Sequence, residues 1–308
     1  MKKPVFTGAG CAIVTPFKGN NNSETDFDKL GELIEFQIKG GTDAIVICGT
    51  TGESSTMPDS EHLDVIEYAV KKTAGRIPVI AGTGSNDTAH GINLSREAVK
   101  RGADALLQVT PYYNKATQKG LVEHYTAIAK AVDVPIILYN VPSRTGVNIA
   151  PDTLQKLSRI PNINGVKECN LSQVSETRCK CGDDLNIWSG EDGQVTLMLG
   201  AGAQGVISVV SNIYPKVMHD IVAKYKAGDV NGSWELQASI LGLVKALFCE
   251  VNPIPVKEAL NILGFNVGGC RLPLCDMEDK NRELLKQAIE DYRAKFVKKP
   301  VIVKGALK

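Results

Sequence analysis

Residues 44–54 read Ala-Ile-Val-Ile-Cys-Gly-Thr-Thr-Gly-Glu-Ser, four apolar residues that lead into a polar turn with two glycines. A continuous apolar run, without alternation of polar residues, is typical of a parallel strand that is covered on both faces. Residues 135–138, Pro-Ile-Ile-Leu, repeat the pattern and precede a second polar segment. These stretches predict an α/β protein that carries its chemistry just after its strands.

Strand-like runs alternate with segments of helical periodicity over the first two thirds of the chain. Eight strands are predicted, at residues 9–15, 43–48, 77–81, 105–109, 135–139, 163–167, 185–188 and 205–209. They predict a (β/α)8 TIM barrel, and a doubly wound open sheet is the alternative. We favour the barrel because reactive residues follow many strands, whereas an open sheet gathers them at one crevice.

The strand pattern stops near residue 213, and helices are predicted at residues 215–226, 231–248, 255–263 and 278–295. We therefore divide the chain into a barrel catalytic domain, a C-terminal helical domain and a lysine-rich tail, at residues 1–226, 227–296 and 297–308. For the tail we expect a solvated, disordered segment, and contact with a polyanion is the alternative.

Composition narrows the class of protein. The 308 residues are 43% hydrophobic and 22% charged, as in soluble globular proteins, and the net charge of +1 argues against nucleic acid as a partner. No apolar stretch reaches the ~20 residues of a membrane span. The apolar run near the start is too short for a signal peptide, so we expect a cytoplasmic protein with eight free cysteines. Cys179-Lys180-Cys181 lacks the spacing of a zinc site, and no metal is expected.

Residues 200–205, Gly-Ala-Gly-Ala-Gln-Gly, match the dinucleotide-binding pattern letter for letter. That pattern must follow a strand and open a helix, so that phosphate meets free N–H groups. Here the glycines are predicted to end a helix and begin a strand, and we reject a dinucleotide site.

Lys167 ends the strand at residues 163–167, and Tyr139 ends the strand before it. In a parallel barrel the two residues would be neighbours at one mouth. A lysine attacks a carbonyl only when neutral, so its pKa of ~10.4 must fall, through burial or a nearby cation. A phenol beside such an amine is a plausible acid/base partner. The pair suggests a Schiff-base enzyme, although a lysine at a strand end is more commonly just solvated.

Three further segments follow strands. The turn at residues 49–54 offers two hydroxyls and free N–H groups to an anion, unless it is only a capped polar turn. Arg144, in Tyr-Asn-Val-Pro-Ser-Arg-Thr-Gly at residues 139–146, suits a carboxylate, with a surface salt bridge as the alternative. The segment Thr-Pro-Tyr-Tyr-Asn at residues 110–114 places two tyrosines on opposite sides of the chain.

These segments, from residues 10–17 through 270–274, resemble the pyruvate-dependent class I aldolase family typified by N-acetylneuraminate lyase. Within that family, the segment that contains Arg144 resembles the corresponding segment of one branch. That branch condenses pyruvate with L-aspartate-4-semialdehyde to 4-hydroxy-tetrahydrodipicolinate, the first committed step of diaminopimelate and lysine biosynthesis. The resemblance implies a lyase with no cofactor and a homotetramer built as a dimer of dimers. It also implies catalytic roles for Lys167, Tyr139, Thr50 and Tyr113, and substrate contacts for Thr51, Arg144, Gly190 and Ile207.

By the same resemblance, Lys167 forms an imine with pyruvate, and Tyr139 relays protons through Thr50 to Tyr113, which crosses from a neighbouring subunit. Thr51 holds the carboxylate of pyruvate and Arg144 that of the semialdehyde. Two rivals stay open. One is a sister aldolase that acts on a 2-keto-3-deoxy sugar acid, and the other is a catalytically idle member that binds a small molecule.

Some family members are inhibited by lysine at a dimer interface, and a remnant of that site is implied at Ser54, Asp59, His62, Asn86, His90 and Tyr112. Asp59 and His90 depart from the lysine-sensitive pattern, which has a histidine and a glutamate at these places. His90 replaces an acid that would bind an ammonium group. We therefore predict weak or absent inhibition by L-lysine in a steady-state assay, and strong inhibition at millimolar L-lysine would refute this.

Overall fold

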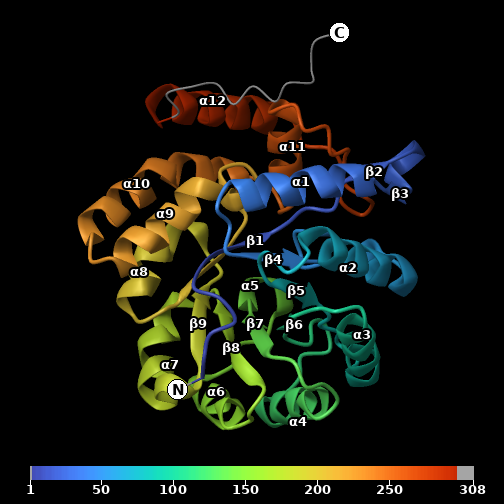
Figure 1. Cartoon of the computed structure of the whole chain (residues 1–308), viewed down its shortest axis with the longest axis vertical. Helices are drawn as coiled ribbons and strands as arrows, with labels where there is room; N and C mark the ends of the chain where they lie inside the picture. Colours follow the sequence, from blue (N-terminus) through green and yellow to red (C-terminus); the bar gives the residue numbers. More distant parts are fainter. Residues whose placement is uncertain (1, 297–308) are drawn as a thin grey trace.

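The computed structural model describes residues 2–296, and eight of its strands close into a barrel (Figure 1). All neighbouring strands in the barrel are parallel, and β1 pairs with both β4 and β10, which closes the ring. The barrel strands are β1 (Gly8–Ala12), β4 (Ala44–Ile47), β5 (Val79–Gly82), β6 (Ala105–Val109), β7 (Ile136–Asn140), β8 (Ile163–Glu168), β9 (Asn186–Ser189) and β10 (Gly205–Ser208). The predicted barrel is confirmed, and the open sheet is excluded.

Each predicted strand lies within a few residues of an observed one. The first strand ends earlier than predicted, at Ala12, because the chain then leaves the ladder and the Val14 N–H donates to the side chain of Asn212 at 3.0 Å. A small hairpin of β2 (Phe17–Lys18) and β3 (Glu24–Thr25) follows. The glycine-rich residues 200–205 connect the end of a helix to β10, so their predicted placement between a helix and a strand is confirmed.

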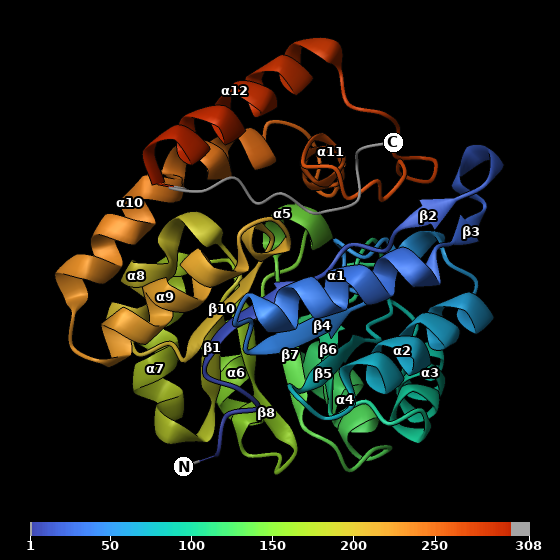
Figure 2. The ribbon, with the colours of Figure 1, turned by 45° about the horizontal axis from the view of Figure 1, so that its top comes forward.

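Helices surround the barrel and extend beyond it. Those in the barrel region are α1 (Phe27–Lys39), α2 (Asp59–Thr73), α3 (Thr88–Lys100), α4 (Gln118–Ala129), α5 (Pro142–Thr145), α6 (Pro151–Ser158), α7 (Val174–Cys181), α8 (Val195–Gly200) and α9 (Pro215–Lys226). The C-terminal helices are α10 (Val230–Leu247), α11 (Ile254–Ile262) and α12 (Asp279–Phe296), close to the predicted bounds. Figure 2 shows these three helices gathered at one end of the molecule, with α5 beneath them.

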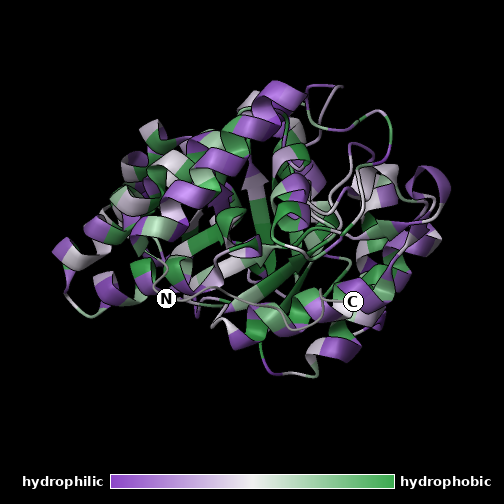
Figure 3. Cartoon of the chain, turned by 90° about the horizontal axis from the view of Figure 1, so that it is seen from above, coloured by the Kyte–Doolittle hydropathy of each residue, from purple (hydrophilic) through white to green (hydrophobic). Residues whose placement is uncertain are grey.

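The strands bury both of their faces. Along β4, Ala44 and Val46 belong to the core inside the barrel, whereas Ile45 and Ile47 belong to the core between strands and helices. Seen from above in Figure 3, apolar strands occupy the centre and the outer helices are striped with hydrophilic residues. This double burial explains the continuous apolar runs in the sequence. The division at residue 226 stays a prediction, and the predicted tail at 297–308 lies outside the described residues.

Two glycines test how tightly the barrel closes. A Cβ on Gly205 would lie 1.8 Å from the backbone oxygen of Gly8, whereas a Cβ on Gly242, in α10, would meet nothing within 4 Å. We expect Gly205→Ala to lower the free energy of unfolding by about 1–3 kcal/mol or more, because the strands must separate. The matched Gly242→Ala should raise it by roughly 0.5–1 kcal/mol, since alanine favours a helix. Urea denaturation followed by circular dichroism measures both, and equal effects would contradict this account of closure.

Candidate active site

Lys167 and Tyr139 lie side by side at the carboxyl ends of β8 and β7. They are paired in the ladder, and Lys167 Nζ lies 4.2 Å from the centroid of the Tyr139 ring. Each residue is 6% exposed, and both line a cavity of about 160 Å³ at the mouth of the barrel. The predicted adjacency of the amine and the phenol is confirmed.

Burial governs the ionisation of both groups. It lowers the pKa of the Lys167 ammonium below its ordinary value of 10.5; Arg144 acts in the same direction, and Asp192 opposes it. Burial also raises the pKa of the Tyr139 phenol, while the charge of Arg144 and then the Thr50 side chain work against that rise. Burial thus shifts both groups toward their neutral forms, and the neutral amine is the form that attacks a carbonyl.

Thr50 and Thr51 also line this cavity, from the turn that follows β4. The turn is closed by a hydrogen bond of 3.1 Å from the Glu53 N–H to the Thr50 carbonyl. Cys48 and Glu53 adopt left-handed backbone angles, with φ of 53° and 55°. Such angles are costly for residues other than glycine and persist only where surrounding contacts enforce them.

Arg144 and Gly190 line the same cavity, whereas the Ile207 side chain lies in the core inside the barrel. Arg144 is carried by the short helix α5, which begins at a proline. Gly190 follows β9, and a Cβ there would lie 2.3 Å from Cys169 Sγ, so only glycine lets the two segments approach. On the strand of Ile207, the cavity is lined by Val209, just past the end of β10.

Tyr113 lies apart from the other predicted catalytic residues. It is 89% exposed, and it follows β6 with a left-handed backbone φ of 73°. Tyr112 is 39% exposed. Within one chain, the described residues that line the cavity do not include Tyr113, and its predicted contact with a neighbouring subunit stays a prediction.

The residues predicted as a regulatory remnant form two contacting pairs and two separate members. His90 Nε2 lies 3.0 Å from Asp59 Oδ1, and Asn86 Nδ2 donates to the Tyr112 carbonyl at 3.1 Å. His62 is buried against a backbone carbonyl, and burial lowers its pKa, whereas Ser54 lines a small recess beside the main cavity. The Asp59 carboxylate is thus already engaged by His90.

Sequence reasoning missed three polar residues of the cavity, Ser143, Glu191 and Asn252. Asn252 lies between α10 and α11, and its Nδ2 donates to Thr51 Oγ1 at 2.9 Å. Its backbone carbonyl accepts from Arg144 Nη2 at 3.4 Å. Only an Asn-Pro turn signal marked Asn252 in the sequence, and nothing there placed the C-terminal helices over the mouth. Glu191 directly follows the predicted Gly190 and could have been included on that ground.

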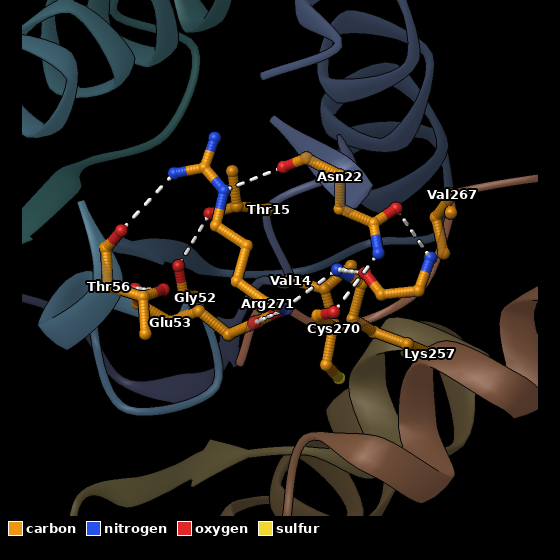
Figure 4. Close-up of polar contacts among 12 residues, drawn as sticks. Val14, Thr15, Asn22, Gly52, Glu53, Thr56, Lys257, Val267, Cys270 and Arg271 are labelled. Carbon is orange, nitrogen blue, oxygen red and sulfur yellow. Dashed lines mark hydrogen bonds and ion pairs between the residues drawn. The ribbon is translucent and has the colours of Figure 1, made fainter. Parts of the chain in front are cut away.

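A buried ion pair holds the threonine turn against α11 (Figure 4). Glu53 Oε1 accepts from Lys257 Nζ at 2.8 Å, and Glu53 Oε2 accepts from the Arg271 N–H at 2.9 Å. Both side chains of the pair are at most 2% exposed. Lys257 and the Arg271 guanidinium also lie over the Phe17 ring, at 4.2 and 4.0 Å from its centroid. These contacts supply the constraint that the left-handed Glu53 backbone needs.

In the part of the chain that the structure describes, the predicted site residues are absent from the other groove of the molecule, and the cysteines form no disulfides. A larger groove, of about 650 Å³, lies between α10 and α12 and contains none of the predicted site residues. Within residues 2–296, no cluster of three or more metal-ligating side chains occurs, and no helix is long and apolar enough to cross a membrane. The eight cysteines are all unpaired, as predicted.

The closed barrel with reactive side chains at the carboxyl ends of its strands defines the class as a (β/α)8-barrel enzyme. The family model of the dihydrodipicolinate synthetase family matches residues 5–292. The chain belongs to that family.

Named relatives and solved structures agree. The chain is 57% identical over 292 residues to the 4-hydroxy-tetrahydrodipicolinate synthase of Acetivibrio thermocellus, covering 95% of this chain and 99% of that protein. The crystal structure of dihydrodipicolinate synthase from Aquifex aeolicus is 45% identical, with a TM-score of 0.91 over 94% of this chain and 98% of that one. The crystal structure of dihydrodipicolinate synthase from Acinetobacter baumannii, complexed with pyruvate, is 43% identical, with a TM-score of 0.90 over 93% of this chain and 98% of that one.

The Glu53–Lys257 pair makes a prediction about stability. Lys257→Met should lower the free energy of unfolding by ~3–5 kcal/mol, because it leaves a buried carboxylate without its cation. The double variant Glu53→Gln with Lys257→Met should recover most of this loss, since neither charge then stays buried alone. Urea denaturation measures each, with the exposed Lys130→Met as a control that stays near wild type. A double variant as unstable as Lys257→Met would contradict the pairing.

Proposed function

We propose that this chain is a lyase that catalyses the 4-hydroxy-tetrahydrodipicolinate synthase reaction, condensing pyruvate with L-aspartate-4-semialdehyde. The observation that carries the proposal is the Lys167 amine, buried 4.2 Å from the Tyr139 ring in a cavity that Arg144 also lines. Relatives named for this reaction, which match almost the whole chain, support it.

In the proposed mechanism, neutral Lys167 attacks the keto carbon of pyruvate, and loss of water leaves an iminium ion. Removal of a methyl proton then gives an enamine, which attacks the aldehyde carbon of the second substrate. Tyr139 relays these protons, because burial keeps its phenol protonated and close to the amine. Thr50 connects it to Tyr113 of the partner subunit, whose exposure on a single chain fits such a crossing.

Two different groups are assigned to the two carboxylates. Thr51 holds pyruvate, since its Oγ1 accepts from Asn252 and keeps its own proton free to donate. Arg144 holds the semialdehyde by its planar fork of N–H groups. Backbone at Gly190 and Ile207 completes the wall. We further propose a cytoplasmic homotetramer, a dimer of dimers, that needs no cofactor and combines the barrel domain with the helical domain from residue 227.

A steady-state assay tests the substrate assignment. Pyruvate consumption is measured with L-aspartate-4-semialdehyde and, separately, with sugar aldehydes. We expect a much higher kcat/KM for the semialdehyde. Comparable values would favour the sister aldolase of sugar acids, and no turnover with either aldehyde would favour an idle binding protein.

Trapping the imine tests the nucleophile. Borohydride reduction in the presence of pyruvate should add a covalent mass to the peptide that contains Lys167, as read by mass spectrometry, and Lys167→Ala should abolish the adduct. Because the neutral amine reacts and burial lowers the pKa of Lys167, the trapping rate should rise with pH and level off below pH 10.5. An adduct on another lysine would overturn the mechanism.

A further inference from the structure

The second substrate of the proposed function poses a problem of charge. L-Aspartate-4-semialdehyde carries an ammonium group on the same carbon as the carboxylate assigned to Arg144. An ammonium group that enters a partly buried cavity without an acceptor loses hydration at a large cost. The acceptor must also lie close to Arg144, because the two substrate charges are fixed to one carbon atom.

Asn252 offers one unused acceptor at this place. The residue is 5% exposed and lines the cavity. Its Nδ2 donates to Thr51 Oγ1, and its backbone carbonyl accepts from Arg144, but its Oδ1 has no hydrogen-bond partner among the described residues. Buried side-chain oxygens are rarely left unpaired, and this one belongs to a residue that lines the cavity, where a bound ligand would supply the missing hydrogen-bond donor.

Glu191 offers the negative charge. It is the sole carboxylate among the described residues that line the cavity. Burial, and then the neighbouring Asp192, raise the pKa of its carboxyl, while the charges of Lys167 and Arg144 act against this rise. A cation that binds beside Glu191 would offset its desolvation, and a carboxyl of raised pKa is a better proton acceptor than an exposed one.

We propose that Glu191 and Asn252 Oδ1 together bind the ammonium group of the aldehyde substrate and select an α-amino aldehyde over one without the amino group. This inference rests on the proposed function and deepens it. Arg144 recognises a carboxylate, which many aldehydes carry, whereas the acceptor pair recognises the feature that distinguishes an amino acid.

Glu191 also serves ring closure. After the carbon–carbon bond has formed, the substrate nitrogen must attack the imine carbon that is bound to Lys167. The ammonium first transfers a proton to the Glu191 carboxylate, and the freed lone pair forms the new carbon–nitrogen bond. The attacking nitrogen passes a proton to the Lys167 nitrogen, the bond from the carbon to Lys167 breaks, the lysine leaves as a neutral amine, and the ring nitrogen releases its last proton to water to leave the cyclic imine. No outside reactant is needed.

Succinate semialdehyde provides the test, because it keeps the aldehyde and the carboxylate but lacks the amino group. The measured quantity is the ratio of kcat/KM for L-aspartate-4-semialdehyde to that for succinate semialdehyde, from pyruvate consumption by the full chain. We expect Glu191→Gln and Asn252→Leu each to lower this ratio by about tenfold to a hundredfold, through loss of a hydrogen bond to a charged group. General damage to the site would slow both aldehydes and leave the ratio unchanged.

Glu235→Gln is the matched control, an exposed glutamate on α10 whose loss should leave the ratio at the wild-type value. If Asn252→Leu fails to fold, the nearly isosteric Glu191→Gln decides alone. If the wild type does not consume succinate semialdehyde, that aldehyde is used as a competitive inhibitor: its inhibition constant should stay constant in Glu191→Gln while KM for the amino aldehyde rises.

The outcomes separate the two proposals. A wild type that condenses pyruvate with L-aspartate-4-semialdehyde, with variants whose ratio stays within twofold of it, overturns the ammonium site and leaves the proposed function standing. A wild type that does not use this aldehyde overturns both.

Discussion

Closure of the parallel barrel is the constraint on which the site depends. The pairing of β1 with both β4 and β10 closes the ring, and because these pairings are parallel, the strands point the same way around one axis. The residues that end or follow the strands must therefore meet at a single mouth. Side chains from β7, β8 and the turn after β4 face one cavity for this reason alone. Without closure, Thr50 and Lys167 would lie on distant parts of an open sheet.

The cavity at the mouth of the barrel is lined by the C-terminal segment as well as by the barrel. The C-terminal segment contributes Asn252, which contacts both Thr51 and Arg144, the residues assigned to the two substrate carboxylates. The same segment carries Lys257, whose ion pair with Glu53 fixes the threonine turn from behind. The helices beyond the barrel thus position the groups that would discriminate substrates, whereas the strands position the amine and the phenol.

Electrostatics within the cavity follows from burial more than from charge pairing. Desolvation is the largest influence on the pKa of Lys167, of Tyr139 and of Glu191. It favours the neutral form of each group. A neutral amine can attack a carbonyl and a neutral phenol can donate a proton, and once the Glu191 carboxylate has accepted a proton, its raised pKa makes it hold that proton more firmly. One physical effect therefore prepares three different chemical roles.

The sequence by itself determined the strands, the preference for a barrel over an open sheet and the adjacency of Tyr139 and Lys167, because continuous apolar runs mark buried parallel strands and reactive residues follow many of them. Resemblance to a family marked Arg144 and the threonine pair. Only the tertiary structure decided that Asn252 reaches the cavity, that Glu53 pairs with Lys257, and that Tyr113 stays exposed on one chain. The contacts of Asn252 with Thr51 and of Lys257 with Glu53 join residues roughly two hundred positions apart, and the partner proposed for Tyr113 lies on another chain. Hydrophobic periodicity carries no information about such contacts.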